Sequence, residues 1–319
     1  MFAICVESSH IRGMGHLFRA INLINELNAR GLCSIIYINN NEKSIKIIEQ
    51  RGISYRVVDL NNFHSRWEKE VITKDCIKVW INDRLDTRIS HVKKLKDNSV
   101  KVISFDDFGD GSKEVDLNIV GLYFTDPSKV NGLNKCIGVR YLILDSDIDL
   151  YKKKRNRIET ILVTLGGSDT HGVTVNVINQ LKKLDIRATI LLGPSFNHYD
   201  ALEKVIDTSF KVIKNVPSLA KEFANYDLAI TGGGITAFEA AASGLPVLMI
   251  ANEIFEIPIC ETLQNLGIGI YIGKYDKFQI TNSHFRIPVE RMSRKGMELI
   301  SPFGAVHVVD EILRVTQYV

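Results

Sequence analysis

Short apolar runs alternate with amphipathic segments along the whole chain. In the first half, runs rich in β-branched residues occupy positions 2–6, 34–38, 55–58, 77–81, 100–104 and 117–120. Between them, as in residues 17–27, apolar side chains recur every three or four positions, a period that predicts helices. The first half of the chain is therefore expected to alternate strand and helix.

A second series of the same kind follows a charged stretch. Its predicted strands are 160–164, 188–192, 210–213, 228–231 and 247–250. Alternating strands and helices predict a parallel sheet that is covered on both faces and joined by right-handed crossovers. We expect an α/β protein with two Rossmann-like domains, residues 1–150 and 151–319, and a terminal helix after Gly304 that is a candidate to pack back on the first domain.

Composition is that of a globular protein and excludes several classes. Of the 319 residues 45% are hydrophobic, the formal net charge is +3, and no basic face is interleaved with aromatic residues, so we expect no nucleic-acid partner. No run has the length of a transmembrane segment and residues 1–6 lack signal-peptide features, so we expect a cytoplasmic protein. The five cysteines form no Cys-x-x-Cys pair and have no histidine at metal-ligand spacing, which predicts reduced thiols and no metal site.

His16 is the main candidate for chemistry. It lies in the run Gly13-Met14-Gly15-His16, between the first predicted strand and the first predicted helix. Glycines allow tight turns and close approach of a ligand, and a helix N-terminus favours phosphate. The same positive end disfavours imidazolium, so we expect a neutral His16 that can accept a proton. From this run alone, a dinucleotide-binding turn and a packed histidine stay open as alternatives.

The dinucleotide alternative lacks two parts of its sequence fingerprint. Phe18 stands where the third glycine is required, and the second predicted strand ends in Asn39-Asn40-Asn41 without an acidic residue. NAD and FAD are therefore not expected, and no cofactor is predicted.

A second glycine cluster, Gly232-Gly233-Gly234, follows a predicted strand and opens a predicted helix. Its N–H groups could bind a phosphate, with Thr236 adding a hydroxyl. Glu239, one turn into the helix, could accept two hydrogen bonds from a ribose diol. The spacing Thr236-x-x-Glu239 fits a capping box equally well, so spacing alone leaves both roles open.

Three aspartates in the first domain are further candidates. Asp83, Asp106 and Asp107 lie at the ends of predicted strands, where ionisable groups could face a bound ligand. An aspartate at a strand end also caps turns, and that structural role is equally open for Asp106 and Asp107.

The charged stretch between the two domains gives weaker signals. Asp145-Ser146-Asp147 mimics an Asp-x-Asp metal-binding motif, but at a domain junction we expect solvated charges. The basic run 152–157 is expected to be a solvated face. Any contact that it makes with an anionic membrane surface should be weak and peripheral.

Five motifs occur in one order along nearly the whole chain. They are the Gly13–His16 run with Arg19, Asp106-Asp107 with Gly109, residues 164–169, Asn215-Val216-Pro217, and the glycines 232–234 with Glu239. Together they resemble the UDP-sugar hydrolase of pseudaminic acid biosynthesis and its spore-coat polysaccharide relatives. More distantly the chain is similar to the N-acetylglucosaminyltransferase of peptidoglycan synthesis, which implies a GT-B fold with two Rossmann-like domains facing across a cleft.

The resemblance implies a division of labour between the domains. His16 would activate water to cleave the C1–O bond of a UDP-sugar, with Asp83 and Asp107 as the other catalytic candidates. Glu239 would hold the ribose, and the backbone of Val216 the uracil edge. The remaining substrate-binding residues would be Gly13, Gly15, Arg19, Gly167, Ser168, Gly233, Gly234, Ile235 and Thr236.

The sequence departs from the family pattern at sugar-facing positions. Relatives often carry Asp-x-Tyr-x-Leu-Asp near the fourth strand, where this chain reads Asn82-Asp83-Arg84, and Gly121 stands where an asparagine often ends a later strand. A hydrolase that frees an amino or acetamido deoxy sugar is favoured. A glycosyltransferase that uses the same base on an acceptor is the alternative, and a 2-epimerase or a non-catalytic binder is less favoured.

Overall fold

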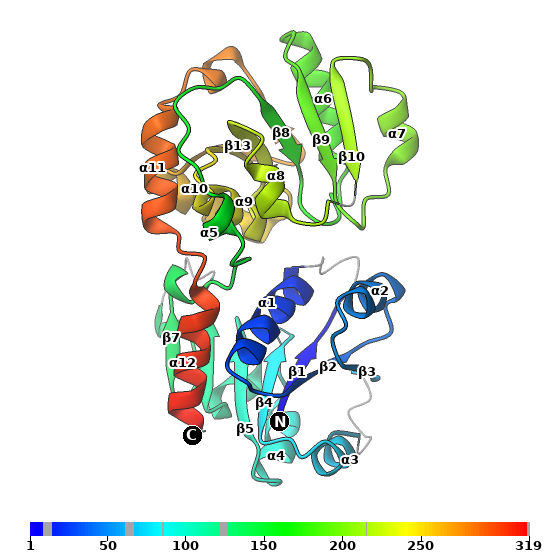
Figure 1. The fold of residues 1–319 in the computed structure, drawn as a ribbon, viewed down its shortest axis with the longest axis vertical. Helices are drawn as coiled ribbons and strands as arrows, with labels where there is room; N and C mark the ends of the chain where they lie inside the picture. The colour runs from blue at the N-terminus through cyan, green and yellow to red at the C-terminus, as the bar shows by residue number, and fades with distance from the viewer. Residues whose placement is uncertain (9–14, 61–66, 85, 122–126, 215, 318–319) are drawn as a thin grey trace. The chain divides into compact units, whose positions relative to one another are not determined.

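The structure is a computed structural model that describes residues 1–8, 15–60, 67–84, 86–121, 127–214 and 216–317 (Figure 1). The chain forms two compact units. The first consists of Met1–Ile143 and Phe303–Val319, and the second of Leu144–Pro302. The boundary thus lies beside the charged stretch, and the terminal helix belongs to the first unit.

The first unit is built on one parallel sheet. Within the described residues its seven strands lie in the order β3 (Tyr55–Val57), β2 (Ser34–Ile38), β1 (Phe2–Val6), β4 (Val79–Asp83), β5 (Lys101–Phe105), β6 (Leu117–Val120) and β7 (Lys135–Ile137). The helices are α1 (Gly15–Ala29), α2 (Glu42–Gln50), α3 (Trp67–Lys74), α4 (Ile89–Lys96) and α12 (Gly304–Thr316).

Both faces of this sheet are buried, which explains the continuous apolar runs. Successive residues of β1 point to opposite faces, so Phe2 and Ile4 join the core under α1 and α12, while Ala3 and Cys5 join the core beside α3 and α4. Figure 1 shows α12 in red, and Arg30, the residue that follows α1, forms a 2.6 Å ion pair with Asp310 of this helix.

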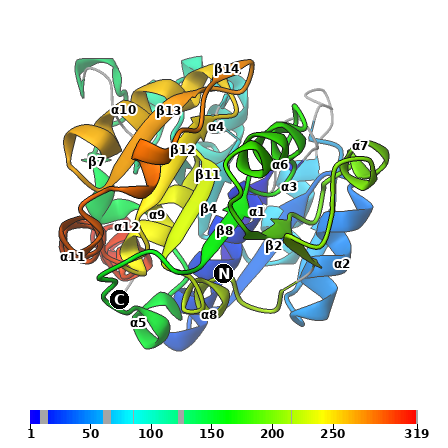
Figure 2. The same cartoon turned by 90° about the horizontal axis from the view of Figure 1, so that it is seen from above.

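The second unit repeats the arrangement. Its seven described strands lie in the order β10 (Phe210–Lys214), β9 (Ala188–Leu192), β8 (Ile161–Thr164), β11 (Leu228–Gly232), β12 (Val247–Ala251), β13 (Gly269–Lys274) and β14 (Lys277–Phe278). They are parallel except for β14, which pairs antiparallel with β13. The helices are α5 (Ile148–Tyr151), α6 (Val173–Lys183), α7 (Tyr199–Glu203), α8 (Leu219–Phe223), α9 (Ile235–Ala242), α10 (Ile257–Asn265) and α11 (Val289–Leu299). Figure 2 shows β8, β11 and β12, which are neighbours in this sheet.

Strand order reverses once in each sheet, and these points are where open α/β sheets bind ligands. In the first sheet the reversal lies between β1 and β4, and in the second between β8 and β11. The loops after β1 and β11 carry the two glycine clusters of the sequence, and α1 and α9 begin directly after them.

The predicted strands are present, with ends displaced by one or two residues. The sequence missed β7, β13 and β14, because they are short or lack a β-branched run. Among the described residues no helix is long and apolar enough to span a bilayer.

The expectation that the basic run 152–157 is a solvated face is wrong for Arg155. This side chain is 2% exposed. Its guanidinium donates to four backbone carbonyls, those of Lys153, Phe223, Tyr226 and Ser243. Burial lowers the pKa of Arg155 to about 10, although Asp227 opposes this. Phe223 is the last residue of α8 and Ser243 is the residue after α9, so Arg155 joins the ends of these two helices.

Candidate functional site

His16 lies in the first turn of α1, and a carboxylate from β4 holds its imidazole. Nδ1 of His16 is 2.6 Å from Oδ1 of Asp83, the last residue of β4. β1, which precedes α1 in the chain, and β4 are neighbours in the sheet, where Val6 pairs with Asp83. Residues far apart in the sequence therefore meet at the point where the strand order reverses.

Arg19, one turn further along α1, completes the cluster. Its Nε donates to Oδ2 of Asp83 at 2.7 Å, and its terminal nitrogens donate to Asp83 and to Asp106, the residue that follows β5. The guanidinium is almost fully buried and lies 4.9 Å from the centre of the Phe105 ring. Burial alone raises the pKa of Asp83, but Arg19 and His16 outweigh it and hold that pKa well below its usual range.

The shorter of two contacts assigns the tautomer of His16, since its Nδ1 lies 2.6 Å from Oδ1 of Asp83 and 3.2 Å from Nη2 of Arg19. Because Asp83 is ionised, we assign the proton to Nδ1 of His16, which leaves the lone pair on Nε2. The side chain as a whole is 16% exposed, so part of the imidazole is accessible from solvent. Asp83 and Asp106 carry two negative charges against one on Arg19, so an imidazolium formed at His16 would neutralise the cluster. The arrangement is suited to a general base.

Asp107 has a different environment from Asp83. Its Oδ1 accepts hydrogen bonds from the N–H groups of Thr87 and Gly109, both at 3.0 Å, and the residue is 1% exposed. A Cβ on Gly109 would lie 2.4 Å from the carbonyl oxygen of Thr87, which explains the glycine of this motif. These contacts give Asp107 the turn-capping role that the sequence left open, and Asp106 is the residue that joins the cluster.

In the second unit the glycine cluster leads into α9. Gly234 is the residue before the helix, and Ile235 and Thr236 are its first two residues. The N–H groups in the first turn of a helix have no partner within that helix, so they are available to an anion. Thr231 and Asn252 flank the loop, and each has a buried side-chain oxygen without a hydrogen-bond partner among the described residues.

The capping-box alternative for Glu239 is wrong. Thr236 lies inside α9 and not before it, and Gly234 caps the helix without a side-chain bond. Glu239 is partly buried, and among the described residues its carboxylate accepts no hydrogen bond. Burial and the nearby Asp145 raise the pKa of Glu239 to about 8. The carboxyl group of Glu239 is therefore an unused acceptor. The negative charge of Asp145 raises its pKa, although the sequence analysis expected Asp145 to be only a solvated charge of the linker.

Gly233 differs from its neighbours because its N–H group is already engaged. It donates to Oε2 of Glu256 at 3.0 Å, and the same oxygen accepts from the N–H of Asn252 at 2.7 Å. Sequence reasoning missed Glu256, because no motif surrounds it. Among the described residues, the N–H groups of Gly234, Ile235 and Thr236 at the start of α9 make no backbone hydrogen bond.

Other predicted binding residues lie at the same edge of the second sheet. The carbonyl of Gly167 accepts from the N–H of Ser195 at 2.9 Å, and Ser168 is 8% exposed. Val216 follows β10 and is partly buried. Gly15 is the first residue of α1, whereas Gly13 and Asn215 lie outside the described residues.

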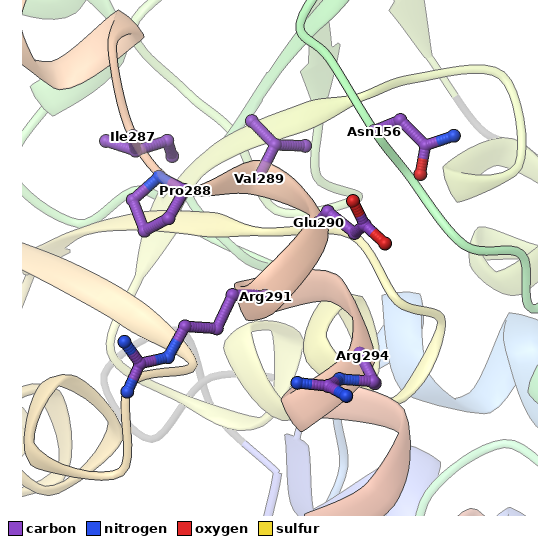
Figure 3. A pocket seen from close by; sticks show the side chains of 7 residues that line it. All are labelled: Asn156, Ile287, Pro288, Val289, Glu290, Arg291 and Arg294. Atoms are coloured by element: carbon purple, nitrogen blue, oxygen red, sulfur yellow. The ribbon is translucent and has the colours of Figure 1, made fainter.

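A separate hollow of about 430 Å³ lies at the start of α11 (Figure 3). It is lined by Asn156, residues 287–291 and Arg294, and includes none of the predicted site residues. Its Glu290 is engaged by Lys154 in an exposed ion pair. Within the described ranges no cluster of three metal-ligating side chains occurs either.

The sequence matches no family model. An uncharacterized protein of Methanocaldococcus jannaschii, MJ1062, is 30% identical over 274 residues, which cover 79% of this chain and 56% of that protein. The chain thus spans about half the length of this relative. The spore coat polysaccharide biosynthesis protein SpsG of Bacillus subtilis is 25% identical over 288 residues, which cover 85% of this chain and 83% of SpsG.

Solved structures show the fold. MurG of Acinetobacter baumannii superposes with a TM-score of 0.66 at 13% identity, over 98% of this chain and 99% of MurG. HepE of Anabaena, in complex with UDP and glucose, has a TM-score of 0.66 at 11% identity, over 98% of this chain and 99% of HepE. With two mostly parallel sheets, each of seven described strands, the chain has the GT-B fold that glycosyltransferases share.

Proposed function

We propose that this protein is a UDP-sugar hydrolase that releases UDP and a free amino or acetamido deoxy sugar, in the biosynthesis of a nonulosonic acid or a surface glycan. The observation that carries the proposal is the 2.6 Å contact between His16 and Asp83. A histidine whose Nδ1–H is fixed by a carboxylate presents a basic Nε2, which is what activation of water requires.

In the proposed reaction a water molecule gives a proton to Nε2 of His16 while its oxygen attacks C1 of the sugar. The C1–O bond breaks, and its electron pair leaves with the β-phosphate oxygen of UDP. Attack opposite the leaving group inverts the configuration at C1. The cluster of Arg19, Asp83 and Asp106 offsets the positive charge that His16 acquires.

Nucleotide binding is assigned to the second unit. The free N–H groups of Gly234 and Ile235 would bind the diphosphate, which needs no metal at a helix N-terminus. Glu239, with an unused carboxyl group, would accept hydrogen bonds from the ribose diol. The likeness of the chain to SpsG and the fold shared with UDP-bound HepE support this assignment.

A glycosyltransferase is the second candidate. It would use the same His16 to deprotonate a hydroxyl or amine of an acceptor, and the GT-B fold of glycosyltransferases favours it equally. The two activities differ only in the nucleophile, so an assay without an acceptor separates them.

The test is to incubate the protein with a panel of UDP-sugars in EDTA without any acceptor. We expect release of UDP together with an equal amount of free sugar, whose first-formed anomer, observed by NMR, is inverted. UDP that binds but is never released from a UDP-sugar without an acceptor would favour the transferase. Binding of UDP that disappears in EDTA and returns with Mg²⁺ or Mn²⁺ would contradict the metal-free assignment.

A further inference from the structure

Glu256 places a carboxylate on the glycine loop itself. It ends the 3-10 turn η4 (Ile254–Glu256) and directly precedes α10. Its Oε2 accepts the N–H of Gly233 at 3.0 Å and that of Asn252 at 2.7 Å. One oxygen atom thus joins the loop after β11 to the loop after β12.

The packing around Gly233 leaves no space for a side chain between this loop and the start of α10. A Cβ added to Gly233 would lie 2.5 Å from Sγ of Cys260 and 2.9 Å from Cβ of Glu256. A Cβ added to Gly234 would lie 3.2 Å from Oε1 of Glu256. The second carboxylate oxygen therefore faces the start of α9, where the free N–H groups are.

We infer that Glu256 competes with the diphosphate for this loop and so limits how tightly the protein holds UDP. The inference rests on the proposed binding of UDP at the start of α9. A carboxylate that already occupies the Gly233 N–H denies that donor to a phosphate and repels its charge. Such competition would favour departure of UDP after the reaction, because UDP carries more negative charge on its terminal phosphate than the sugar-bound form.

The variant that tests this is Glu256→Gln, which keeps an oxygen able to accept from Gly233 and Asn252 but removes the negative charge. We expect calorimetry to show UDP binding at least fivefold more tightly to this variant than to the unmodified protein. Binding of uridine, which has no phosphate, should change less than twofold. Glu261→Gln, which removes an exposed acid from α10, is the matched control and should leave both affinities within twofold.

Equal affinity of UDP for the Glu256→Gln variant and the unmodified protein, or weaker binding to the variant, would overturn the inference. If Glu256→Gln unfolds, Glu256→Ala frees the Gly233 N–H completely and should give the same tightening of UDP. A tightening shared equally by uridine would also refute the inference, since it would not involve the phosphates.

Failure of the proposed function is distinguishable from failure of this inference. A protein that binds UDP, tightens its hold in Glu256→Gln but releases no sugar from UDP-sugars would contradict the hydrolase and leave the inference standing. A protein that binds neither UDP nor uridine would refute the assignment of the nucleotide to α9, and the inference with it.

Discussion

The two points where the strand order reverses present different chemical groups. In the first unit the groups are charged side chains, His16, Arg19 and Asp83, which are held in place by one another. In the second unit they are backbone N–H groups at the start of α9, exposed by glycines. Proton transfer requires a titratable group in a fixed position, whereas binding of an anion requires several donors and little bulk. The same topology therefore serves two tasks.

The difference also concerns stability. Asp83 is buried and neutralises Arg19, so it is part of the framework of the first unit. Glu239 is partly buried, and its carboxylate accepts no hydrogen bond among the described residues, so the framework of the second unit does not depend on this side chain. Substitutions in the first unit should therefore affect catalysis, and that of Asp83 should also lower stability. Substitution of Glu239 in the second unit should affect nucleotide binding without lowering stability.

The largest effect is expected for His16→Asn. Loss of a positioned base should lower kcat by ~10²–10⁴-fold, while the Kd of UDP stays within twofold, because binding is assigned to the other unit. Steady-state kinetics and calorimetry measure the two quantities. His307→Asn, on α12, is the control and should leave both unchanged. A main defect in UDP binding would mean that His16 contacts phosphate and is not the base.

Asp83→Asn should reduce stability as well as activity. It leaves the buried guanidinium of Arg19 with only Asp106 as a carboxylate partner, and we expect the free energy of unfolding to fall by about 3 kcal/mol. The activity should fall too, because an amide no longer fixes the tautomer of His16. Urea denaturation measures the stability. An unchanged midpoint would show that the pair with Arg19 contributes little to the fold.

Glu239→Ala should show the opposite behaviour. Above pH 8, where Glu239 is mostly ionised, we expect UDP binding to weaken by ~1.5–3 kcal/mol, the usual value for hydrogen bonds to a charged acceptor. The melting temperature should not fall, because no described residue uses this carboxyl group as an acceptor. Calorimetry and a thermal melt decide the outcome, with Glu261→Gln as the control. Unchanged UDP affinity would remove Glu239 from the site.

The smallest effect is a pH dependence of nucleoside binding. Glu239 has a pKa of about 8, so below pH 8 it is mostly protonated and a ribose diol that donates to its carboxylate must release the proton. The Kd of uridine should therefore fall as the pH rises towards 8, by at most about tenfold per pH unit, and level off above it. Uridine avoids the titration of the phosphates. A profile that is the same in Glu239→Gln would assign the effect elsewhere.

Local sequence patterns predicted much of the fold because the core strands are buried on both faces. β1 and β12 read as unbroken apolar runs, and β8 is apolar up to its last residue, Thr164. The positions of His16 and the glycine cluster between strand and helix followed from such runs. The pairing of His16 with Asp83 was not visible, although both residues were candidates. Sequence spacing carries no information on which strand lies beside β1.

The sequence by itself determined the strand and helix alternation, the glycine loops and the candidate base. Only the tertiary structure decided which carboxylate serves the base, because Asp83 contacts His16, whereas Asp106 contacts Arg19 and Asp107 accepts from backbone N–H groups. It also decided that Arg155 is buried and that Glu256 occupies the Gly233 N–H. The physical reason is common to all three. A charged side chain is defined by the donors and acceptors that the fold brings to it, and those come from residues that are distant in the sequence.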